Sequence, residues 1–218
     1  MWVKICGNTN LADALLAVNA GADAVGFVFG ESKRRVTPEQ VAAITLELPG
    51  TVEKIGVIVN EMPQRVAEIV RIAGLTGVQL QGDETPEFTG DLRRLGLRRL
   101  VKTVQASAGV DMLASRIAQY RSVVDSILLD SGSPAERGGT GKRFAWKDAA
   151  VQLANVSVPV IVAGGLNPEN VEEAIMTLRP WGVDVVTGVE REPGKKDPEK
   201  IAAFINAARR ADKNVLAL

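Results

Sequence analysis

Cys6 is the only cysteine among 218 residues, and the chain contains no histidine. A site that transfers protons must therefore use Cys, Asp, Glu, Lys or Tyr side chains. Cys6 stands at the last position of the first strand-like run. If the fold is a closed barrel of parallel strands, a thiol at that end could act as a base. A small buried cysteine that only packs is the alternative, and the residues alone leave both open.

Asp130 directly follows the aliphatic residues Ile127, Leu128 and Leu129. Such a carboxyl is either a cap or loop residue, or a catalytic acid whose pKa is raised by burial. Lys4 and Cys6 alternate onto the same face of one strand, about 7 Å apart. If that face points inward, we expect the Lys4 ammonium to favour the Cys6 thiolate.

Two glycine-containing strand ends lie late in the chain. Gly164 and Gly165 end the seventh strand-like run, and Thr187 and Gly188 end the eighth. Loops at these two places of a barrel often bind phosphate through backbone N–H groups, so we predict a phosphate site there. Ordinary turn glycines are the alternative.

Arg34 lies in a cationic run between Ser32 and Arg35. Its guanidinium could bind a substrate carboxylate through two parallel hydrogen bonds. A run of this kind is more often a solvated loop, so both interpretations remain.

The long connection from Ser131 to Phe144 contains the segment Gly138–Lys142, which superficially resembles a phosphate-binding P-loop. The P-loop motif requires glycine at position 136 and Ser or Thr at position 143. Glu136 and Arg143 stand there instead, so nucleotide binding of that kind is excluded. We expect a mobile active-site loop that carries a lysine.

Eight short runs rich in Val and Ile could hold these residues in place. Their nearly continuous hydrophobicity is typical of parallel strands covered on both sides. The predicted strands are Trp2–Cys6, Ala24–Phe29, Lys54–Val59, Val78–Gln81, Arg99–Val104, Ile127–Asp130, Val158–Val162 and Asp184–Thr187.

Helix patterns alternate with these strands, and four capping residues followed by proline indicate helix starts. The pairs are Thr37-Pro38, Thr85-Pro86, Asn167-Pro168 and Asp197-Pro198. Eight strand–helix units predict an α/β fold, a single (β/α)8 TIM barrel of eight parallel strands. An open doubly wound sheet is less favoured because no Gly-x-Gly-x-x-Gly follows the first strand.

The predicted barrel domain covers residues 1–210, and residues 211–218 are predicted to be a short tail. In a ring of eight strands, the first and sixth are three steps apart. Cys6 and Asp130 are therefore expected to face each other across the mouth, with space for a substrate between them.

The composition limits the partners that we expect. Basic and acidic residues balance at 26 each, so no nucleic-acid or membrane partner is predicted. No apolar run is long enough for a transmembrane helix, and the start of the chain does not look like a signal peptide. One cysteine cannot form an internal disulfide, which fits the cytoplasm.

Several stretches together resemble the phosphoribosylanthranilate isomerase family of the tryptophan pathway. They keep the family's order from the first strand to the start of the last helix. They are Lys4–Gly7, Gly21–Phe29, Ser32–Arg34, Val78–Leu80, Leu129-Asp130, Gly138–Lys142, Gly164–Val171, Gly188–Glu190 and Pro193–Asp197.

The resemblance implies an Amadori rearrangement of a phosphoribosylated anthranilate, with no cofactor and no metal. It implies that Cys6 is the general base that removes the C2′ proton. It implies that Asp130 is the general acid for the ring oxygen. Arg34 would hold the anthranilate carboxylate, with Asp184 near the anthranilate. The phosphate would bind to backbone groups at Gly164, Gly165, Thr187 and Gly188. The partner is thus a phosphorylated small molecule, and the protein itself is expected to be a monomer or a homodimer.

The chain departs from the family pattern at two places. Gln81 stands where the family commonly has histidine, so either a histidine is not needed here or its role is carried by the Gln81 amide. Val186 and Thr187 replace the family's two serines, so phosphate binding must depend more on backbone N–H groups.

Two rival functions remain. One is the related aminoaldose-phosphate isomerase of histidine biosynthesis, whose barrels have aspartate where this chain has Cys6. The other is a catalytically silent barrel that only binds a phosphoribosyl ligand. That second rival would need neither Cys6 nor Asp130.

Overall fold

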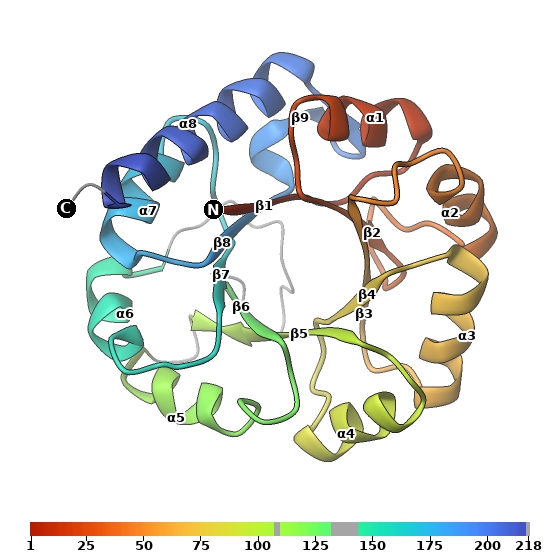
Figure 1. Ribbon diagram of the computed structural model, residues 1–218, viewed down its shortest axis with the longest axis horizontal. Helices are drawn as coiled ribbons and strands as arrows, with labels where there is room; N and C mark the ends of the chain where they lie inside the picture. Colours follow the sequence, from red (N-terminus) through yellow and green to blue (C-terminus); the bar gives the residue numbers. More distant parts are fainter. Residues whose placement is uncertain (107–109, 132–143, 217–218) are drawn as a thin grey trace.

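The structure is a computed structural model that describes residues 1–106, 110–131 and 144–216. Eight parallel strands follow one another around a closed barrel in chain order, and helices surround them (Figure 1). Lys4 pairs with Ala24 of one neighbouring strand and with Asp184 of the other, which closes the ring. The strands are β1 (Trp2–Ile5), β2 (Ala24–Val28), β3 (Glu53–Ile58), β4 (Gly77–Leu80), β5 (Arg99–Gln105), β6 (Ser126–Asp130), β7 (Val160–Val162) and β8 (Gly182–Val185).

The helices pack against the outside of this ring. They are α1 (Leu11–Asn19), α2 (Pro38–Thr45), α3 (Pro63–Ala73), α4 (Pro86–Arg94), α5 (Leu113–Ala118), α6 (Trp146–Leu153), α7 (Val171–Leu178) and α8 (Pro198–Leu216), with short 3-10 turns η2 (Val110–Met112) and η3 (Thr187–Val189). The predicted (β/α)8 barrel is therefore confirmed. Capping agrees at α2, where Thr37 accepts from the Gln40 N–H and Gln40 bonds back in a capping box.

Strand alternation produces two apolar layers. On β1, Val3 and Ile5 belong to the large cluster between barrel and helices, whereas Trp2 belongs to the cluster inside the barrel. The inner cluster consists of Trp2, Ala24, Ile55, Val101, Leu128, Ile161 and Ala163. The inward face of β1 therefore continues from Trp2 through Lys4 to Cys6, as the alternation predicted. The inner layer closes the barrel beneath the mouth, so the barrel is packed and not a pore.

The observed strands differ from the predicted bounds by one or two residues, and three corrections concern the site and its loops. β1 ends at Ile5, so Cys6 is the first residue after the strand. β8 ends at Val185, so Thr187 and Gly188 lie in η3. Asn167 does not cap α7, because the Asn167 side chain accepts from the N–H groups of Glu169 and Asn170 in a turn that precedes the helix.

The expectation of a tail from residue 211 was wrong as far as residue 216. α8 continues to Leu216 because its apolar face continues to pack, and Ala211 is completely buried. The Met1 ammonium also forms an ion pair with Asp212 at 2.6 Å, so the N-terminus of the chain is bound to the C-terminal helix α8.

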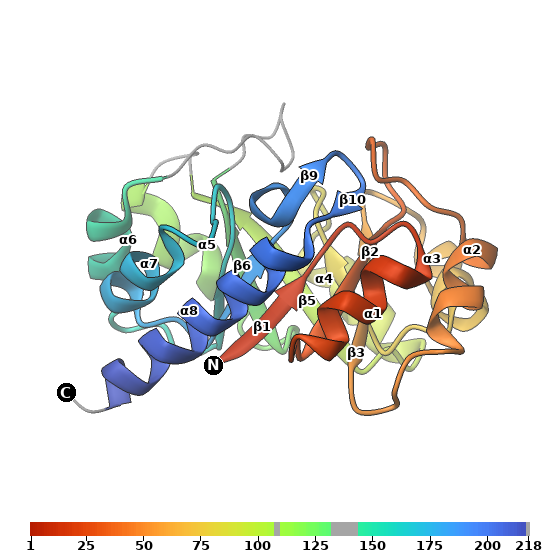
Figure 2. The ribbon, with the colours of Figure 1, turned by 90° about the horizontal axis from the view of Figure 1, so that it is seen from above.

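A short antiparallel hairpin, which the sequence did not predict, precedes α8. It consists of β9 (Glu190–Glu192) and β10 (Lys195–Lys196), joined by a turn in which Gly194 has φ +82°. Seen from the side, the hairpin lies near the end of the barrel toward which β1 runs, away from the N-terminus (Figure 2). These two strands therefore bring charged residues close to the mouth.

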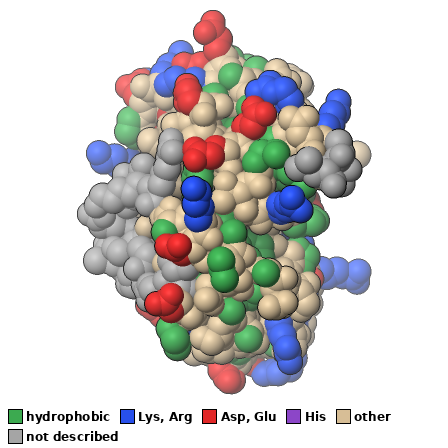
Figure 3. All heavy atoms as spheres, turned by 90° about the vertical axis from the view of Figure 1, so that its left-hand side faces the viewer, with side chains coloured by type: hydrophobic (Ala, Val, Ile, Leu, Met, Phe, Trp, Pro, Cys, Tyr) green, Lys and Arg blue, Asp and Glu red, His purple; other side chains and the backbone are tan. Residues whose placement is uncertain are grey.

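The surface shows no segregation of charge on the face in Figure 3, where acidic and basic side chains are interspersed. In the part of the chain that the structure describes, no helix has the length and apolar character needed to cross a membrane.

Candidate active site

A cavity of about 600 Å³ opens at the C-terminal ends of the barrel strands. The cavity is large enough for a ligand of several rings or sugar units, and it lies where barrel enzymes hold their substrates. All eight predicted site residues line it, namely Cys6, Arg34, Asp130, Gly164, Gly165, Asp184, Thr187 and Gly188. Residues far apart in the sequence thus meet in one place.

Cys6 is held in the wall of the cavity by its backbone and by a tight side-chain fit. Its N–H donates to the carbonyl of Val185 at 2.9 Å, which ties it to the end of β8. Its Sγ occupies the space over Gly26, where an added Cβ would lie only 2.4 Å from the sulfur. Only glycine at this position of β2 leaves room for the thiol.

Burial raises the pKa of the Cys6 thiol above its ordinary value, since the charged thiolate loses hydration. Lys4 opposes this effect and lowers the pKa, as its expected role requires, but burial outweighs it. Asp184 also raises the pKa of Cys6. In the ligand-free protein, Cys6 is therefore a weak acid and a strong potential base.

Lys4 and Asp184 form a buried ion pair inside the barrel, with 2.9 Å between Nζ and Oδ1. They are register partners on β1 and β8, so the barrel closure itself brings them together. Burial lowers the pKa of Lys4, but Asp184 and Cys6 raise it more and the net shift is upward. Lys4 is consequently shared between Asp184 and the cysteine.

Asp130 ends β6 on the opposite side of the cavity, three strands from β1 around the ring. Its Oδ2 accepts a hydrogen bond from Gln81 Nε2 at 3.1 Å. Gln81 Oε1 in turn accepts from Gln79 and Thr103, each at 2.7 Å. Gln81, at the place of the family histidine, thus presents an oriented amide to the carboxyl group.

Arg34 reaches the cavity from the loop between β2 and α2. Its guanidinium is bound by Glu190 on the side away from the cavity. Arg34 Nε lies 2.8 Å from Glu190 Oε1, and Nη2 lies 2.5 Å from Oε2. Glu190 does not line the cavity, whereas Arg34 does. This bidentate bond raises the pKa of Arg34, so its charge is permanent.

The glycines of the two late loops are required by close backbone approach. Gly164 has φ +81°, and an added Cβ would lie 2.4 Å from the Ser131 backbone nitrogen. A Cβ on Gly188 would lie 2.0 Å from the carbonyl oxygen of Leu166. Within the described residues, the N–H groups of Gly164, Gly165, Thr187 and Gly188 donate to no protein acceptor. Four neighbouring donors are therefore available to an anion.

Two further expectations concern other parts of the chain. The predicted active-site loop with Gly138–Lys142 lies outside the described residues. Among the residues that are described, no group of His, Cys, Asp or Glu is arranged to hold a metal ion.

Sequence reasoning assigned no role to Glu190 and Lys196, which lie buried beside the site. Both fall in segments that carry the family resemblance. The only signal was the pattern of Glu, Pro-Gly and Lys in a short segment, which is compatible with a hairpin.

Fold and site together define a (β/α)8-barrel enzyme whose mouth combines a thiol, a carboxyl group, an arginine and backbone N–H donors. The family model described as N-(5′-phosphoribosyl)anthranilate (PRA) isomerase matches residues 3–207. The chain belongs to this family.

Relatives support the assignment over nearly the full length. An N-(5′-phosphoribosyl)anthranilate isomerase of Pelobacter propionicus is 46% identical, with 95% of each chain covered. One from Bacillus cereus is 45% identical and is covered completely, by 98% of this chain. The crystal structure of the Thermotoga maritima enzyme is similar with a TM-score of 0.87 and 41% identity, over 96% of this chain and 99% of that one.

A further structure of a phosphoribosyl anthranilate isomerase contains reduced 1-(o-carboxyphenylamino)-1-deoxyribulose 5-phosphate. It is similar with a TM-score of 0.84 and 39% identity, over 96% of this chain and 99% of that one.

Proposed function

We propose that this chain converts N-(5′-phosphoribosyl)anthranilate to 1-(o-carboxyphenylamino)-1-deoxyribulose 5-phosphate in tryptophan biosynthesis. The proposed reaction is supported by membership of the isomerase family. The observation that carries the site is that all eight expected residues line the same cavity. The ligand named for one solved relative has the same three parts as the proposed product, a phosphate, a sugar chain and a carboxylated ring.

The proposed first step opens the furanose ring. Asp130 gives its proton to the ring oxygen, the bond from C1′ to that oxygen breaks, and the anilino nitrogen forms a C=N bond with C1′. The carboxylate left on Asp130 is then stabilised by the hydrogen bond from Gln81. Gln81 cannot take the proton itself, so it orients the acid without competing with it.

The proposed second step moves the double bond. The Cys6 thiolate removes the C2′ proton, and the electron pair forms a C1′=C2′ bond while the iminium nitrogen is neutralised. Protonation at C1′ and loss of the hydroxyl proton at C2′ then give the ketone. Cys6 suits this role because burial raises the pKa of its thiol, and the thiolate of a thiol with a higher pKa is a stronger base.

Binding is assigned to groups around the acid and the base. Arg34 would pair with the anthranilate carboxylate, and Asp184 would lie near the aromatic ring, where it also holds Lys4. The phosphate would accept from the N–H groups of the two late loops, which donate to no acceptor in the part of the chain that the structure describes. The loss of one serine hydroxyl at Val186 is consistent with a site that depends on backbone donors.

Neither rival function explains the site as well. The aminoaldose isomerase of histidine biosynthesis would have aspartate at position 6, where this chain has cysteine. A silent phosphate-binding barrel would not need a carboxyl oriented by Gln81 across the cavity from a thiol.

We also propose a cytoplasmic location and a monomeric or homodimeric state. A biosynthetic family and a single free cysteine support the location. One 40% identical relative from Thermotoga maritima is described as dimeric, with monomers generated from it. Analytical ultracentrifugation would distinguish the two states.

A fluorescence assay tests the reaction. Phosphoribosylanthranilate is fluorescent and can be generated in situ, and the purified protein should accelerate its disappearance far beyond the uncatalysed decay. Mass spectrometry should detect an isomer of unchanged mass. A decay rate that does not depend on protein concentration would contradict the proposed function.

A further inference from the structure

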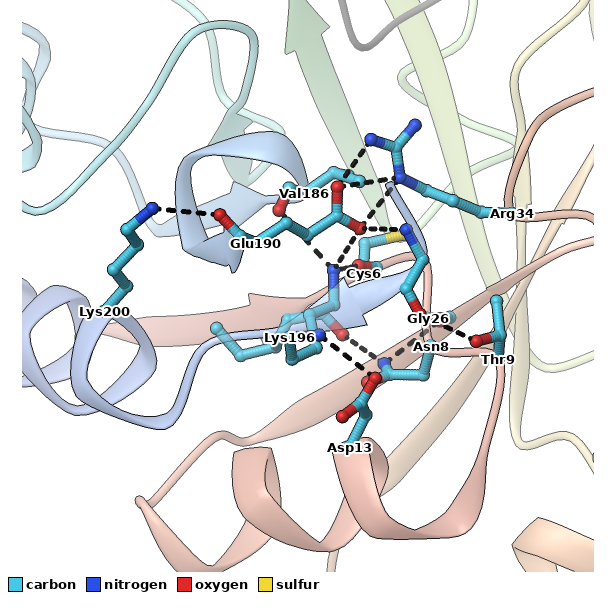
Figure 4. A network of polar contacts seen from close by, with 12 residues as sticks. Cys6, Asn8, Thr9, Asp13, Gly26, Arg34, Val186, Glu190, Lys196 and Lys200 are labelled. Carbon is cyan, nitrogen blue, oxygen red and sulfur yellow. Dashed lines mark hydrogen bonds and ion pairs between the residues drawn. The ribbon is translucent and has the colours of Figure 1, made fainter. Parts of the chain in front are cut away.

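Two buried charged residues of the β9–β10 hairpin lie directly behind the cavity wall. Glu190 is 6% exposed and Lys196 is 1% exposed, although both side chains are ionisable. Figure 4 shows their side chains converging with Arg34 beside Cys6, from elements that are distant in the sequence. Burying charges is costly unless they are paired, so this arrangement requires a reason beyond surface solvation.

Glu190 occupies one edge of the Arg34 guanidinium with hydrogen bonds. Its two oxygens accept from Nε and Nη2, and within the described residues Nη1 makes no hydrogen bond. The edge formed by Nη1 and the remaining Nη2 hydrogen is thus left for a ligand, and Arg34 lines the cavity. A guanidinium held in this way cannot rotate to offer a different edge.

Lys196 fixes Glu190 in turn. Its Nζ donates to Glu190 Oε1 at 3.1 Å and to the Cys6 carbonyl at 2.5 Å. The Gly194 N–H also donates to Glu190 Oε1, at 3.2 Å. Glu190 therefore has donors on both oxygens, and one residue connects the arginine support to the backbone of Cys6.

The charges of this cluster favour an anionic ligand. Burial acts to raise the pKa of Glu190, but Arg34 and Lys196 outweigh it, so its pKa lies below the ordinary range. Burial lowers the pKa of Lys196, and Glu190 opposes this shift. One carboxylate between two cations leaves a formal charge of plus one when Lys196 is protonated. A substrate carboxylate on the free edge of Arg34 would neutralise it.

We propose that Glu190 is a specificity-determining positioning residue, which holds Arg34 so that the enzyme selects substrates with a carboxylate on the aromatic ring. The proposal rests on the proposed function for the identity of the substrate. Glu190 touches neither the cavity nor the reacting atoms. It acts through Arg34, and Lys196 aligns this support with the cysteine.

The test compares two ligands that differ only in the carboxylate. These are the reduced 1-(o-carboxyphenylamino)-1-deoxyribulose 5-phosphate and its phenylamino counterpart without the carboxyl group. Calorimetric titration of both gives the dissociation constant of the phenylamino ligand divided by that of the carboxylated ligand, a measure of carboxylate preference that needs no turnover. Kinetics with phosphoribosylanthranilate and phosphoribosylaniline gives the corresponding ratio of kcat/KM.

Glu190→Gln should lower both ratios by roughly tenfold, the lower end of the contribution of a hydrogen bond to a charged group. Most of the kinetic change should appear in KM for the carboxylated substrate, with kcat less affected. Glu192→Gln is the matched control. Glu192 lies on the same strand with an exposed carboxylate paired to Lys195 at 2.6 Å, and its ratios should stay at the wild-type values.

A double-mutant cycle separates positioning from general structural support. Glu190→Gln should not lower the ratios further in an Arg34→Met background, because the group through which it acts is already missing. Glu190→Asp, which keeps the charge but shortens the side chain, should give intermediate ratios. It also provides a folded variant if the Gln protein is unstable.

Unchanged ratios in Glu190→Gln and Glu190→Asp would overturn the proposal. A higher carboxylate preference would also overturn it, since Glu190 would then compete with the ligand for Arg34. An equal effect of Glu190→Gln with and without Arg34 would do the same. A wild-type protein that binds with carboxylate preference but turns over neither substrate would contradict the proposed function and leave this inference standing.

Discussion

At the scale of single residues, the proposed acid Asp130 and the proposed base Cys6 both line the cavity, and each is supported by a different set of contacts. Asp130 receives an amide hydrogen bond from Gln81, which is itself fixed by two further side chains. The Cys6 sulfur interacts with the buried Lys4 ammonium, and Cys6 is also held by its backbone and by the space over Gly26. The proposed acid is therefore oriented by a neutral amide network, whereas the proposed base lies beside a buried cation.

The pH dependence of the Cys6 thiol follows from its burial. Alkylation of the ligand-free protein by iodoacetamide requires the thiolate, so its rate should rise with pH and inflect above about 8.5, the value of a free cysteine. Cys6 is the only cysteine, so the measurement is unambiguous.

Two variants should shift the pKa of Cys6 in opposite directions, which tests the causes assigned to it. Lys4 lowers the pKa of Cys6, so Lys4→Met should move the inflection to higher pH. Asp184 raises it, so Asp184→Asn should move the inflection to lower pH. An inflection near pH 7 in the wild type would show that burial does not dominate. A downward shift in Lys4→Met would remove Lys4 from any role in favouring the thiolate.

At the scale of elements, the loops after β7 and β8 depend on each other. Gly188 of η3 packs against the carbonyl of Leu166, and Gly164 packs against the backbone of Ser131 after β6. Three successive loops thus approach one another closely at these two glycines. The proposed phosphate site follows from this approach, because the backbone N–H groups at Gly164, Gly165, Thr187 and Gly188 donate to no acceptor among the described residues.

Gly188→Ala should force these loops apart and weaken phosphate binding. An added Cβ would lie 2.0 Å from the Leu166 oxygen, a backbone atom that cannot rotate away. We expect a rise of about tenfold or more in KM and in the inhibition constant of inorganic phosphate, with a stability loss of about 1–3 kcal/mol from overpacking.

Gly50→Ala is the control for this substitution, because a Cβ on Gly50 meets no atom within 4 Å. It should leave KM and phosphate inhibition unchanged. Unaltered phosphate inhibition in Gly188→Ala would place the phosphate elsewhere.

The elements themselves were largely predictable, for a clear physical reason. Strands covered on both sides are continuous apolar runs, and all eight were located within two residues. Asn167 misled because an Asn-Pro pair indicates a turn as readily as a helix cap, and the turn occurs here. The β9–β10 hairpin was missed because its strands are two and three residues long and charged. The end of α8 was missed because no breaker residue marks it.

At the scale of the whole molecule, barrel closure decides which distant residues meet. Pairing of β1 with β8 joins Lys4 to Asp184, and the hairpin after β8 brings Glu190 to Arg34 across 156 positions of sequence. Cys6, Asp130 and the glycines could be proposed because strand ends and motifs place them. The support of Arg34 by Glu190 could not be predicted, because the spacing of two charged residues so far apart in the sequence does not indicate that they are in contact.

The central claim is that Cys6 and Asp130 act as base and acid from opposite sides of one cavity. Turnover of phosphoribosylanthranilate by wild type, Cys6→Ser and Asp130→Asn, each checked for folding by circular dichroism, tests it most directly. Each substitution should lower kcat by about two orders of magnitude or more, the scale of general acid–base catalysis. Near wild-type kcat in either folded variant would contradict the claim and require another proton-transfer group.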